Sequence, residues 1–340
     1  MAKIAINGLG RIGRAFLKIA IHRPELEIVA VNDLGELDNL AYLLKYDSAY
    51  GHAKETIEVR DGKLVVDGKE ILFVHEKDAT KLPWGNLGID IVLESTGVFD
   101  SFQKSKMHLD AGAKRVVISA PVKDEAPEGI GAGTVLMGIN EEKLATCQIS
   151  SNASCTTNSA SPLIQILHEK IGVEKAILNT VHGYTATQHL VDSPDAKDWR
   201  RGRAAAVSII PSTTGAAIAV TEAVEDLKGK FDGIALRVPV ITGSAADITF
   251  IAKRDTSVEE INNILRSAAN EERWKKVFSV TDEQIVSADI VGSHYAAVAD
   301  LSFTRVVGGN LVKVLSWYDN EMGYTYALIE HVIKSAQYIQ

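Results

Sequence analysis

The chain has 340 residues, a formal net charge of −8 at pH 7, 46% hydrophobic residues and 24% charged residues. This composition is typical of a globular protein of about two domains. No apolar run reaches the roughly 20 residues of a membrane span, and no signal-peptide pattern precedes the first predicted strand. Nucleic-acid binding as a main role needs a basic face, which an acidic chain does not favour. Two cysteines are too few for a disulfide framework, so we expect a cytoplasmic protein with no membrane partner.

The chain begins with a predicted strand, a glycine-rich turn and a helix. The apolar run Ile4–Asn7 leads into Gly-Leu-Gly-Arg-Ile-Gly, and a helical pattern follows over Ile12–His22. Gly8 serves the tight turn, Gly10 lets the backbone approach a pyrophosphate, and Gly13 lets the helix pack on the strand. The N–H groups at the helix start attract the anion. The motif therefore predicts a dinucleotide site.

An acidic residue follows the second predicted strand. The apolar run Glu27–Asn32 ends in Asp33, 20 residues beyond Gly13. A carboxylate at this place accepts a hydrogen bond from a ribose 2′-hydroxyl. Because the same carboxylate repels a 2′-phosphate, the sequence favours NAD over NADP.

Short apolar runs continue over the first 150 residues and alternate with helical or turn-rich segments, which predicts a parallel α/β sheet. One run ends in Ser95-Thr96-Gly97, small polar residues of the kind found where a parallel strand meets a ligand crevice. The segment Thr56–Gly68 contains two Asp-Gly turn signals and predicts an inserted hairpin. The predicted strands are Ile4–Asn7, Ile28–Asn32, Ile71–Val74, Ile89–Thr96, Arg115–Ser119 and Val135–Ile139.

Beyond residue 155 the strand-like runs are longer and fewer helices intervene. The Gly308-Gly309 pair between two runs predicts a hairpin, and the last segment, Thr325–Gln340, predicts a helix. The predicted strands are Lys175–Val181, Gly233–Val238, Ala246–Ala252, Ala296–Val307 and Leu311–Trp317, and the predicted helices are Ser161–Gly172, Gly215–Leu227 and Val258–Asn270. The fold class is therefore α/β, with an N-terminal Rossmann-type parallel sheet and an α+β domain that has a mixed or antiparallel sheet with helices on one side.

Cys155 lies in the sequence Ser-Asn-Ala-Ser-Cys-Thr-Thr-Asn, just before the amphipathic segment Pro162–Gly172. A helix N-terminus lowers the pKa of a thiol and favours the thiolate at neutral pH. We therefore predict that Cys155 is a nucleophile; the alternative is a polar capping loop that happens to hold a cysteine. Cys147, in a strand-like run, is interpreted as a small buried hydrophobe.

His182 is the best candidate for the base among the nine histidines. It ends the apolar run Ala176–Val181, so we expect it at the exit of a strand. A histidine at a strand end is by itself more often structural. Beside a nucleophilic cysteine it can take the thiol proton, and this pairing favours a catalytic role.

A basic segment interrupts the acidic chain. Residues 197–203 carry four positive charges and one negative charge, a pattern that alone indicates a solvated loop or a nucleic-acid patch. However, the hydroxyl-rich segment Pro211–Gly215 leads into a predicted helix, and Arg237 lies in an apolar run without an acidic neighbour. A buried arginine needs an anionic partner, and arginine, threonine and helix N–H groups together form phosphate sites. The sequence therefore predicts two anion sites.

Over its full length the chain resembles the phosphorylating glyceraldehyde-3-phosphate dehydrogenases. The resemblance is carried by the glycine motif, the motif around Cys155, His182-Gly-Tyr-Thr, Arg203-Ala-Ala-Ala, Pro211-Ser-Thr-Thr-Gly-Ala-Ala and Ser316-Trp-Tyr-Asp-Asn-Glu. It implies a homotetrameric glycolytic enzyme without a metal. This enzyme oxidises D-glyceraldehyde 3-phosphate with NAD and inorganic phosphate to 1,3-bisphosphoglycerate through a cysteine thioester. It also implies an NAD-binding domain over residues 1–153, completed by a C-terminal helix over 320–340, and a catalytic domain over 154–319.

The resemblance also implies a role for each matching residue. Cys155 is the nucleophile and His182 its base. The phosphate of the substrate is held by Thr185, Thr187 and Arg237, and inorganic phosphate by Ser154, Thr156, Arg201, Thr214 and Gly215. The cofactor contacts Gly8, Gly10, Arg11, Ile12, Asp33, Thr96, Ser119 and, at its nicotinamide carboxamide, Asn320. The segment from His182 to about Val207 reaches the cofactor site of a neighbouring subunit.

Other functions remain open at this point. An erythrose-4-phosphate dehydrogenase shares the fold and the nucleophile but has a weakened second anion site. A semialdehyde dehydrogenase lacks two phosphate sites, and a nucleotide-binding regulator or RNA-binding protein needs neither Cys155 nor His182. The presence of Thr185, Arg201 and Thr214 favours the triose phosphate enzyme.

Overall fold

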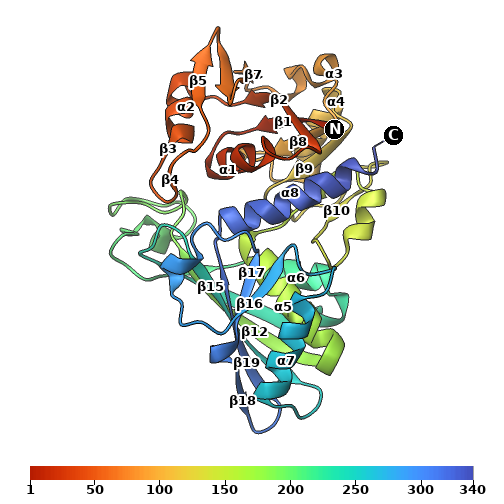
Figure 1. Cartoon of the computed structure of the whole chain (residues 1–340), viewed down its shortest axis with the longest axis vertical. Helices are drawn as coiled ribbons and strands as arrows, with labels where there is room; N and C mark the ends of the chain where they lie inside the picture. Colours follow the sequence, from red (N-terminus) through yellow and green to blue (C-terminus); the bar gives the residue numbers. More distant parts are fainter. Residues whose placement is uncertain (340) are drawn as a thin grey trace. The chain divides into compact units, whose positions relative to one another are not determined.

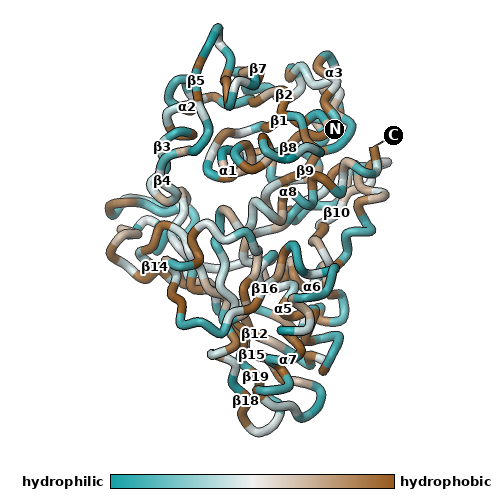
Figure 2. The backbone as a smooth tube through the Cα atoms, viewed as in Figure 1, coloured by the Kyte–Doolittle hydropathy of each residue, from teal (hydrophilic) through white to brown (hydrophobic). Residues whose placement is uncertain are grey.

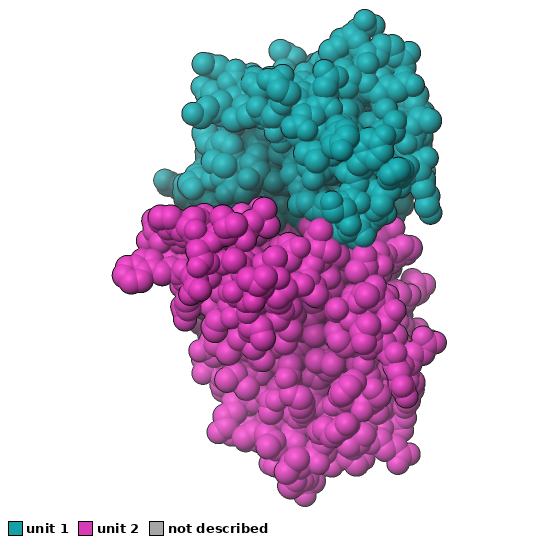
Figure 3. Space-filling view, turned by 90° about the vertical axis from the view of Figure 1, so that its left-hand side faces the viewer, with its two compact units in different colours: residues 1–153, 328–340 teal, residues 154–327 magenta. Residues whose placement is uncertain are grey.

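The computed structural model describes residues 1–339 as two compact units (Figures 1 and 3). The first unit combines residues 1–153 with the C-terminal segment from Leu328, and the second comprises residues 154–327. No helix in this described range is long and apolar enough to cross a membrane.

The first unit is built on a nine-stranded sheet with the strand order β10-β11-β9-β8-β1-β2-β7-β6-β5. Neighbouring strands are parallel from β10 to β7, and β6 and β5 form an antiparallel extension. Its elements are β1 (Ala2–Asn7), α1 (Arg11–Ala20), β2 (Leu26–Asn32), α2 (Leu37–Lys45), β3 (Tyr46–Asp47), β4 (Gly51–His52), β5 (Ile57–Arg60), β6 (Lys63–Val66), β7 (Lys69–Val74), α3 (Trp84–Leu87), β8 (Ile91–Glu94), α4 (Phe102–Asp110), β9 (Arg115–Ile118), β10 (Ala132–Thr134) and β11 (Ile149–Ser151).

The order in which the strands are added to this sheet indicates where a ligand binds. From β1 the chain first adds β2 and β7 on one side and then β8 and β9 on the other. Every residue of β8 and β9 is buried, as expected for parallel strands covered on both faces. The direction of winding reverses between β1 and β8, and ligands of such sheets bind at the carboxyl ends of the strands at that point.

The second unit is built on a mixed sheet with the strand order β13-β14-β12-β15-β19-β17-β16, and β18 pairs with β19 at its edge. The helices α5, α6 and α7 pack on one face (Figure 1), and buried residues alternate with more exposed ones along β15 and β19. Its elements are α5 (Cys155–Ile171), β12 (Val173–Gly183), β13 (Ile210–Thr213), α6 (Ala216–Ala223), β14 (Phe231–Val238), β15 (Ser244–Ala252), α7 (Val258–Ala269), β16 (Phe278–Thr281), β17 (Ala297–Asp300), β18 (Arg305–Val307), β19 (Leu311–Tyr318) and the start of α8 (Met322–Ala336).

The predicted fold class is confirmed: a mostly parallel first sheet and a mixed second sheet. The inserted hairpin is β5 and β6, whose polar tip is teal in Figure 2, and the Gly308-Gly309 hairpin joins β18 to β19. The predicted last helix is α8, with Gln340 outside the described residues.

Three predicted elements are wrong in extent. The run Val135–Ile139 is a turn rather than a strand, because the side chain of Asn140 accepts from Leu136 N–H and donates to Thr134 O. The predicted strand Ala296–Val307 is broken after Asp300, whose carboxylate accepts from the N–H of Ser302. The helix predicted from Ser161 begins at Cys155, with Pro162 inside it.

One buried histidine makes the first unit sensitive to acid. His331 of α8 is fully buried, with Nε2 2.7 Å from Ser150 Oγ and Nδ1 3.1 Å from Asn152 Oδ1. The amide oxygen only accepts, so Nδ1 carries the proton and Nε2 accepts from the serine hydroxyl. Burial lowers the pKa of His331 from 6.5 to about 3.

We predict that replacing His331 by Gln makes folding less dependent on pH between 4 and 6.5. Because the unfolded state binds a proton below pH 6.5 and the folded state does not, the histidine removes stability as the pH falls. The loss between pH 7 and pH 5 is about 2 kcal/mol. Urea unfolding at both pH values measures it, and equal losses in wild type and His331→Gln contradict the prediction.

Candidate active site

The glycine motif has the geometry of a nucleotide-binding turn. Gly8 has φ +98°, and a Cβ there would lie 2.7 Å from Thr96 N. A Cβ on Gly13 would lie 2.0 Å from Gly8 O, so only glycine lets α1 approach β1 this closely. Nothing lies within 4 Å of a Cβ on Gly10, and α1 has neither an acidic residue in its first turn nor a side-chain cap. Open space above a helix start without acidic residues fits a pyrophosphate.

Asp33 follows β2 at the same edge of the sheet. Its Oδ2 accepts from Leu9 N–H at 2.6 Å and its Oδ1 from Gly35 N–H at 2.8 Å, which fixes the carboxylate beside the glycine turn. Arg11, at the start of α1, is 2.7 Å from Asp47 Oδ2. The other predicted cofactor residues of this unit are Ile12 in α1, Thr96 directly after β8 and Ser119 directly after β9.

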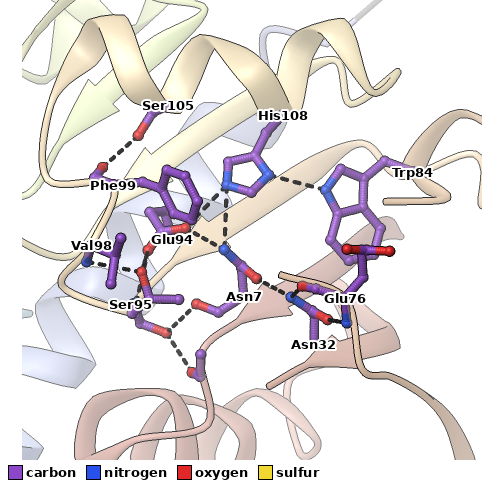
Figure 4. Close-up of polar contacts among 12 residues, drawn as sticks. Asn7, Asn32, Glu76, Trp84, Glu94, Ser95, Val98, Phe99, Ser105 and His108 are labelled. Atoms are coloured by element: carbon purple, nitrogen blue, oxygen red, sulfur yellow. Dashed lines mark hydrogen bonds and ion pairs between the residues drawn. The ribbon is translucent and has the colours of Figure 1, made fainter. Parts of the chain in front are cut away.

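A buried polar network ties the strand ends of this crevice together (Figure 4). Asn7 is paired in register with Asn32 of β2 and with Glu94 of β8. Glu94 Oε2 accepts from Asn7 Nδ2 at 2.5 Å and lies 3.0 Å from His108 Nε2, while Oε1 accepts from the N–H and hydroxyl of Thr96. Asn32 Nδ2 donates to Asn7 Oδ1 at 2.7 Å. The carboxylate of Glu94 therefore connects the ends of β1 and β8, and Asn7 extends the network to the end of β2.

In the second unit, Cys155 is the first residue of α5. Ser154 caps this helix, with its hydroxyl accepting from Thr157 N–H at 3.1 Å. Ala153, two residues before the helix, has φ +55°, which turns the chain sharply between β11 and α5. The turn and the cap place the thiol at the helix start.

His182 lies next to Cys155, with Nε2 3.3 Å from Sγ. It is 3% exposed and precedes Gly183, the last residue of β12. Its Nδ1 is 2.6 Å from Gly183 O and 2.6 Å from Arg237 Nη1. When Nδ1 carries the proton it donates to the Gly183 carbonyl, and Nε2 faces the thiol with a lone pair, which suits a base. When Nδ1 is unprotonated it accepts from Arg237, and Nε2 carries the proton.

The ionisation of this pair differs from the sequence-based expectation. Burial raises the pKa of the Cys155 thiol, and the opposing effects of Arg237 and the helix-start N–H of Thr156 do not overcome it. Burial and the charge of Arg237 lower the pKa of His182 to about 3. In the free protein, burial therefore opposes the thiolate that the helix start favours.

The predicted phosphate residues form two groups. Thr185 and Thr187 follow β12 with their hydroxyl oxygens 2.9 Å apart, and Arg237 lies at the end of the neighbouring β14. Arg201 Nη2 donates to Ser212 Oγ of β13 at 2.8 Å. Thr214 and Gly215 lead into α6, where the Thr214 hydroxyl accepts from Ala216 N–H.

Two of the arginines stand out because they lack an ion-pair partner among the described residues. Neither Arg201 nor Arg237 forms an ion pair with a carboxylate within residues 1–339, whereas most neighbouring charges are paired, as in Arg200–Asp198 and Arg203–Asp192. Burial and the charge of Arg201 lower the pKa of Arg237. An arginine stays protonated in spite of such shifts, so both guanidinium groups carry a positive charge.

Sequence reasoning missed a buried hydroxyl cluster behind the catalytic pair. Tyr318 OH is 2.8 Å from both Thr156 Oγ1 and Thr180 Oγ1, and its ring meets that of His182 edge-on. The hydroxyl and the backbone N–H of Thr156, together with the backbone N–H of Cys155, also interact with the sulfur of Cys155. The motif around Tyr318 was visible in the sequence, but no pattern indicated which strand it faces.

Both halves of the chain match models of one family. Residues 2–102 match the glyceraldehyde 3-phosphate dehydrogenase NAD binding domain, and residues 154–320 match the C-terminal domain of the same family. Glyceraldehyde-3-phosphate dehydrogenase of Clostridium pasteurianum is 48% identical over 334 residues, which covers 97% of each chain. The chain belongs to the glyceraldehyde-3-phosphate dehydrogenase family.

Other members of the glyceraldehyde-3-phosphate dehydrogenase family are similarly related. The protein of that name from Thermotoga maritima is 49% identical over 333 residues, with 97% of this chain and 98% of the relative covered. That of Geobacillus stearothermophilus is 45% identical over 330 residues, with 96% of each covered. The full-length resemblance stated from the motifs is thereby confirmed.

We predict that Arg237→Met slows alkylation of Cys155 by iodoacetamide several-fold at pH 8. The thiolate is the reactive form, and removal of the guanidinium removes a charge that lowers the thiol pKa, so the rise of rate with pH moves to higher pH. The uncharged reagent does not itself require an anion site. Arg237→Lys keeps the charge and should keep the profile; an unchanged profile in Arg237→Met contradicts the argument.

Proposed function

We propose that this chain is a phosphorylating glyceraldehyde-3-phosphate dehydrogenase, which oxidises D-glyceraldehyde 3-phosphate with NAD and inorganic phosphate to 1,3-bisphosphoglycerate. The observation that carries the proposal is the contact of Cys155 Sγ with His182 Nε2 at 3.3 Å, flanked by two arginines without ion-pair partners. A thiol and a base suit acyl transfer, and two cationic groups suit one phosphate on the substrate and one that attacks. The family membership and the names of the relatives support the same reaction.

We assign cofactor binding mainly to the first unit. The open helix start at Gly10, with Gly8, Arg11 and Ile12, suits the pyrophosphate, and Asp33 suits the adenosine ribose. Thr96 and Ser119 follow strands that end at the same edge. In the second unit Asn320 suits the nicotinamide carboxamide, since its Nδ2 has no acceptor in the described part of the chain. When bound, NAD supplies an acceptor for hydride.

Catalysis begins with addition of the Cys155 sulfur to the aldehyde carbon. The thiol proton passes to His182 Nε2 as the C–S bond forms, because burial disfavours the charged form of each member of the pair. A phosphate bound at Arg237 offsets the positive charge that lowers the pKa of His182, so the imidazole becomes a stronger base in the substrate complex. The backbone N–H of Cys155 stabilises the oxyanion, and the imidazolium returns its proton to that oxygen to form the hydroxyl. The neutral imidazole of His182 takes this proton back when the hydroxyl-bearing carbon is oxidised.

The thioester is the intermediate that conserves the oxidation energy. Thr185, Thr187 and Arg237 hold the phosphate of the substrate, while Ser154, Thr156, Arg201, Thr214 and Gly215 hold inorganic phosphate for attack on the thioester carbonyl. Attack forms the C–O bond of the acyl phosphate and releases the sulfur, which regains its proton from His182. An erythrose-4-phosphate dehydrogenase is not favoured, since the relatives carry the name of the triose phosphate enzyme.

We predict that NADH formation from glyceraldehyde 3-phosphate requires inorganic phosphate for turnover, and that NADP is the poorer cofactor because of Asp33. Cys155→Ser should abolish oxidation, since an alkoxide forms far less readily than a thiolate. His182→Asn should lose about 10²–10⁴-fold in rate. Absorbance of NADH with and without phosphate measures these effects.

Cys147→Ser is the matched control for that experiment, because Cys147 is buried in a hydrophobic cluster with Val135 and Leu144. It should keep near-normal turnover. Phosphate-independent turnover, or near-normal activity of Cys155→Ser, would falsify the proposed reaction.

We also propose a cytoplasmic homotetramer. The face of the second sheet opposite α5–α7 exposes apolar side chains, with Ile177 of β12 58% exposed and Ile234 of β14 52% exposed. The segment between β12 and β13 exposes further apolar residues, among them Leu190, Trp199 and Val207. Exposed apolar surface of this kind supports subunit contacts.

Sedimentation equilibrium should therefore give four times the chain mass of 36.7 kDa. Ile177→Asp places a charge on the exposed sheet face and should yield smaller species. Val286→Asp is the control, because Val286 is as exposed as Ile177 but lies outside the strands. A monomeric wild type, or equal behaviour of the two variants, contradicts the proposal for this face.

A further inference from the structure

Ser244 links the strand end that carries His182 to the loop that carries Asn320. It is the first residue of β15 and is 1% exposed. Its Oγ accepts from Gly183 N–H at 3.1 Å and lies 2.8 Å from Asn320 Oδ1. No role has been assigned to it in the reaction described above.

The hydroxyl of Ser244 decides which way the amide of Asn320 faces. A hydroxyl has a single proton. Since the backbone N–H of Gly183 can only donate, that proton is available to the side chain of Asn320, whose Oδ1 accepts it at 2.8 Å. The NH₂ group of Asn320 therefore points away from Ser244.

Thr242 is the other hydroxyl near the amide oxygen. Its Oγ1 is 3.2 Å from Asn320 Oδ1 but 2.8 Å from Asp319 Oδ1. The proton of Thr242 goes to the nearer acceptor, which is a carboxylate. Ser244 is thus the main donor that fixes the orientation of Asn320.

The oriented NH₂ group lacks a partner in the protein. Asn320 is only 6% exposed, and within residues 1–339 no acceptor lies within hydrogen-bond distance of Nδ2. A donor that makes no hydrogen bond within the protein is available to a ligand carbonyl. The carboxamide of the nicotinamide ring offers such an oxygen, an assignment that rests on the proposed function.

We propose that Ser244 is a positioning residue that locks the amide of Asn320 with its NH₂ group toward the nicotinamide carboxamide. Without the lock, the amide can turn by 180° and present an oxygen to the carbonyl of the ring. The same hydroxyl accepts from the N–H of Gly183, which follows His182. Ser244 therefore also holds the contact between Asn320 and the nicotinamide carboxamide in place relative to Cys155 and His182.

The test compares binding of NAD with binding of ADP-ribose, which lacks the nicotinamide ring, by titration calorimetry without substrate. Wild type should bind NAD more tightly than ADP-ribose. Ser244→Ala should weaken NAD binding about tenfold, as expected for one buried hydrogen bond, and leave ADP-ribose binding unchanged. Equal loss for both ligands indicates a general structural effect and overturns the proposal.

Ser316→Ala is the matched control, because Ser316 of β19 is fully buried and its hydroxyl meets Ser159 at 3.1 Å, away from Asn320. It should bind both ligands like wild type. If Ser244→Ala does not fold, Ser244→Cys keeps a weak donor of similar size and should give a smaller, still NAD-specific loss.

A double-mutant cycle separates this proposal from the assigned role of Asn320. In an Asn320→Ala background, Ser244→Ala should cause no further loss of NAD affinity; an additive loss overturns the positioning role. If wild type binds NAD and ADP-ribose equally, or Asn320→Ala leaves NAD binding intact, the nicotinamide role of Asn320 fails instead.

Discussion

The buried carboxylate of Glu94 is the interaction on which the cofactor side of this protein depends. Desolvation of a carboxylate costs several kcal/mol unless donors replace its water. Here the donors are Asn7, both polar hydrogens of Thr96 and, from α4, His108. His108 accepts from the indole N–H of Trp84 at Nδ1, so its Nε2 carries the proton that faces Glu94. The carboxylate is satisfied only when the ends of β1 and β8 and the helix α4 are all in place.

The second unit shows the opposite arrangement, because two of its arginine side chains have no ion-pair partner among residues 1–339. Arg237 and Arg201 have no carboxylate partner in the described chain, although acidic residues outnumber basic ones by 44 to 36. Burial, together with the charge of Arg237, lowers the pKa of His182 in the free protein. An anionic substrate removes that penalty, so binding and activation of the base are coupled through one charge. Because of this coupling, the free-energy cost of the positive charge beside His182 falls on the empty site rather than on the transition state.

Local patterns predicted the elements well wherever one physical signal dominated. The glycine motif requires Gly8 and Gly13 because any Cβ would collide with backbone, and that requirement can be seen in the sequence. Errors arose where a side chain overrides the apolar pattern, as Asn140 does after β10 and Asp300 does after β17. The start of α5 was predicted at Ser161 because the amphipathic pattern begins at Pro162, whereas the helix begins at Cys155.

The sequence by itself determined the fold class, the family and the identity of the nucleophile and base candidates, since spacing and residue type carry that information. The tertiary structure alone decided their protonation, because burial and the approach of Arg237 depend on residues 55 positions from His182. It also decided the orientation of Asn320, which a hydroxyl 76 residues away sets through a single proton. A sequence pattern reports neighbours along the chain, whereas desolvation and hydrogen-bond direction depend on neighbours in space.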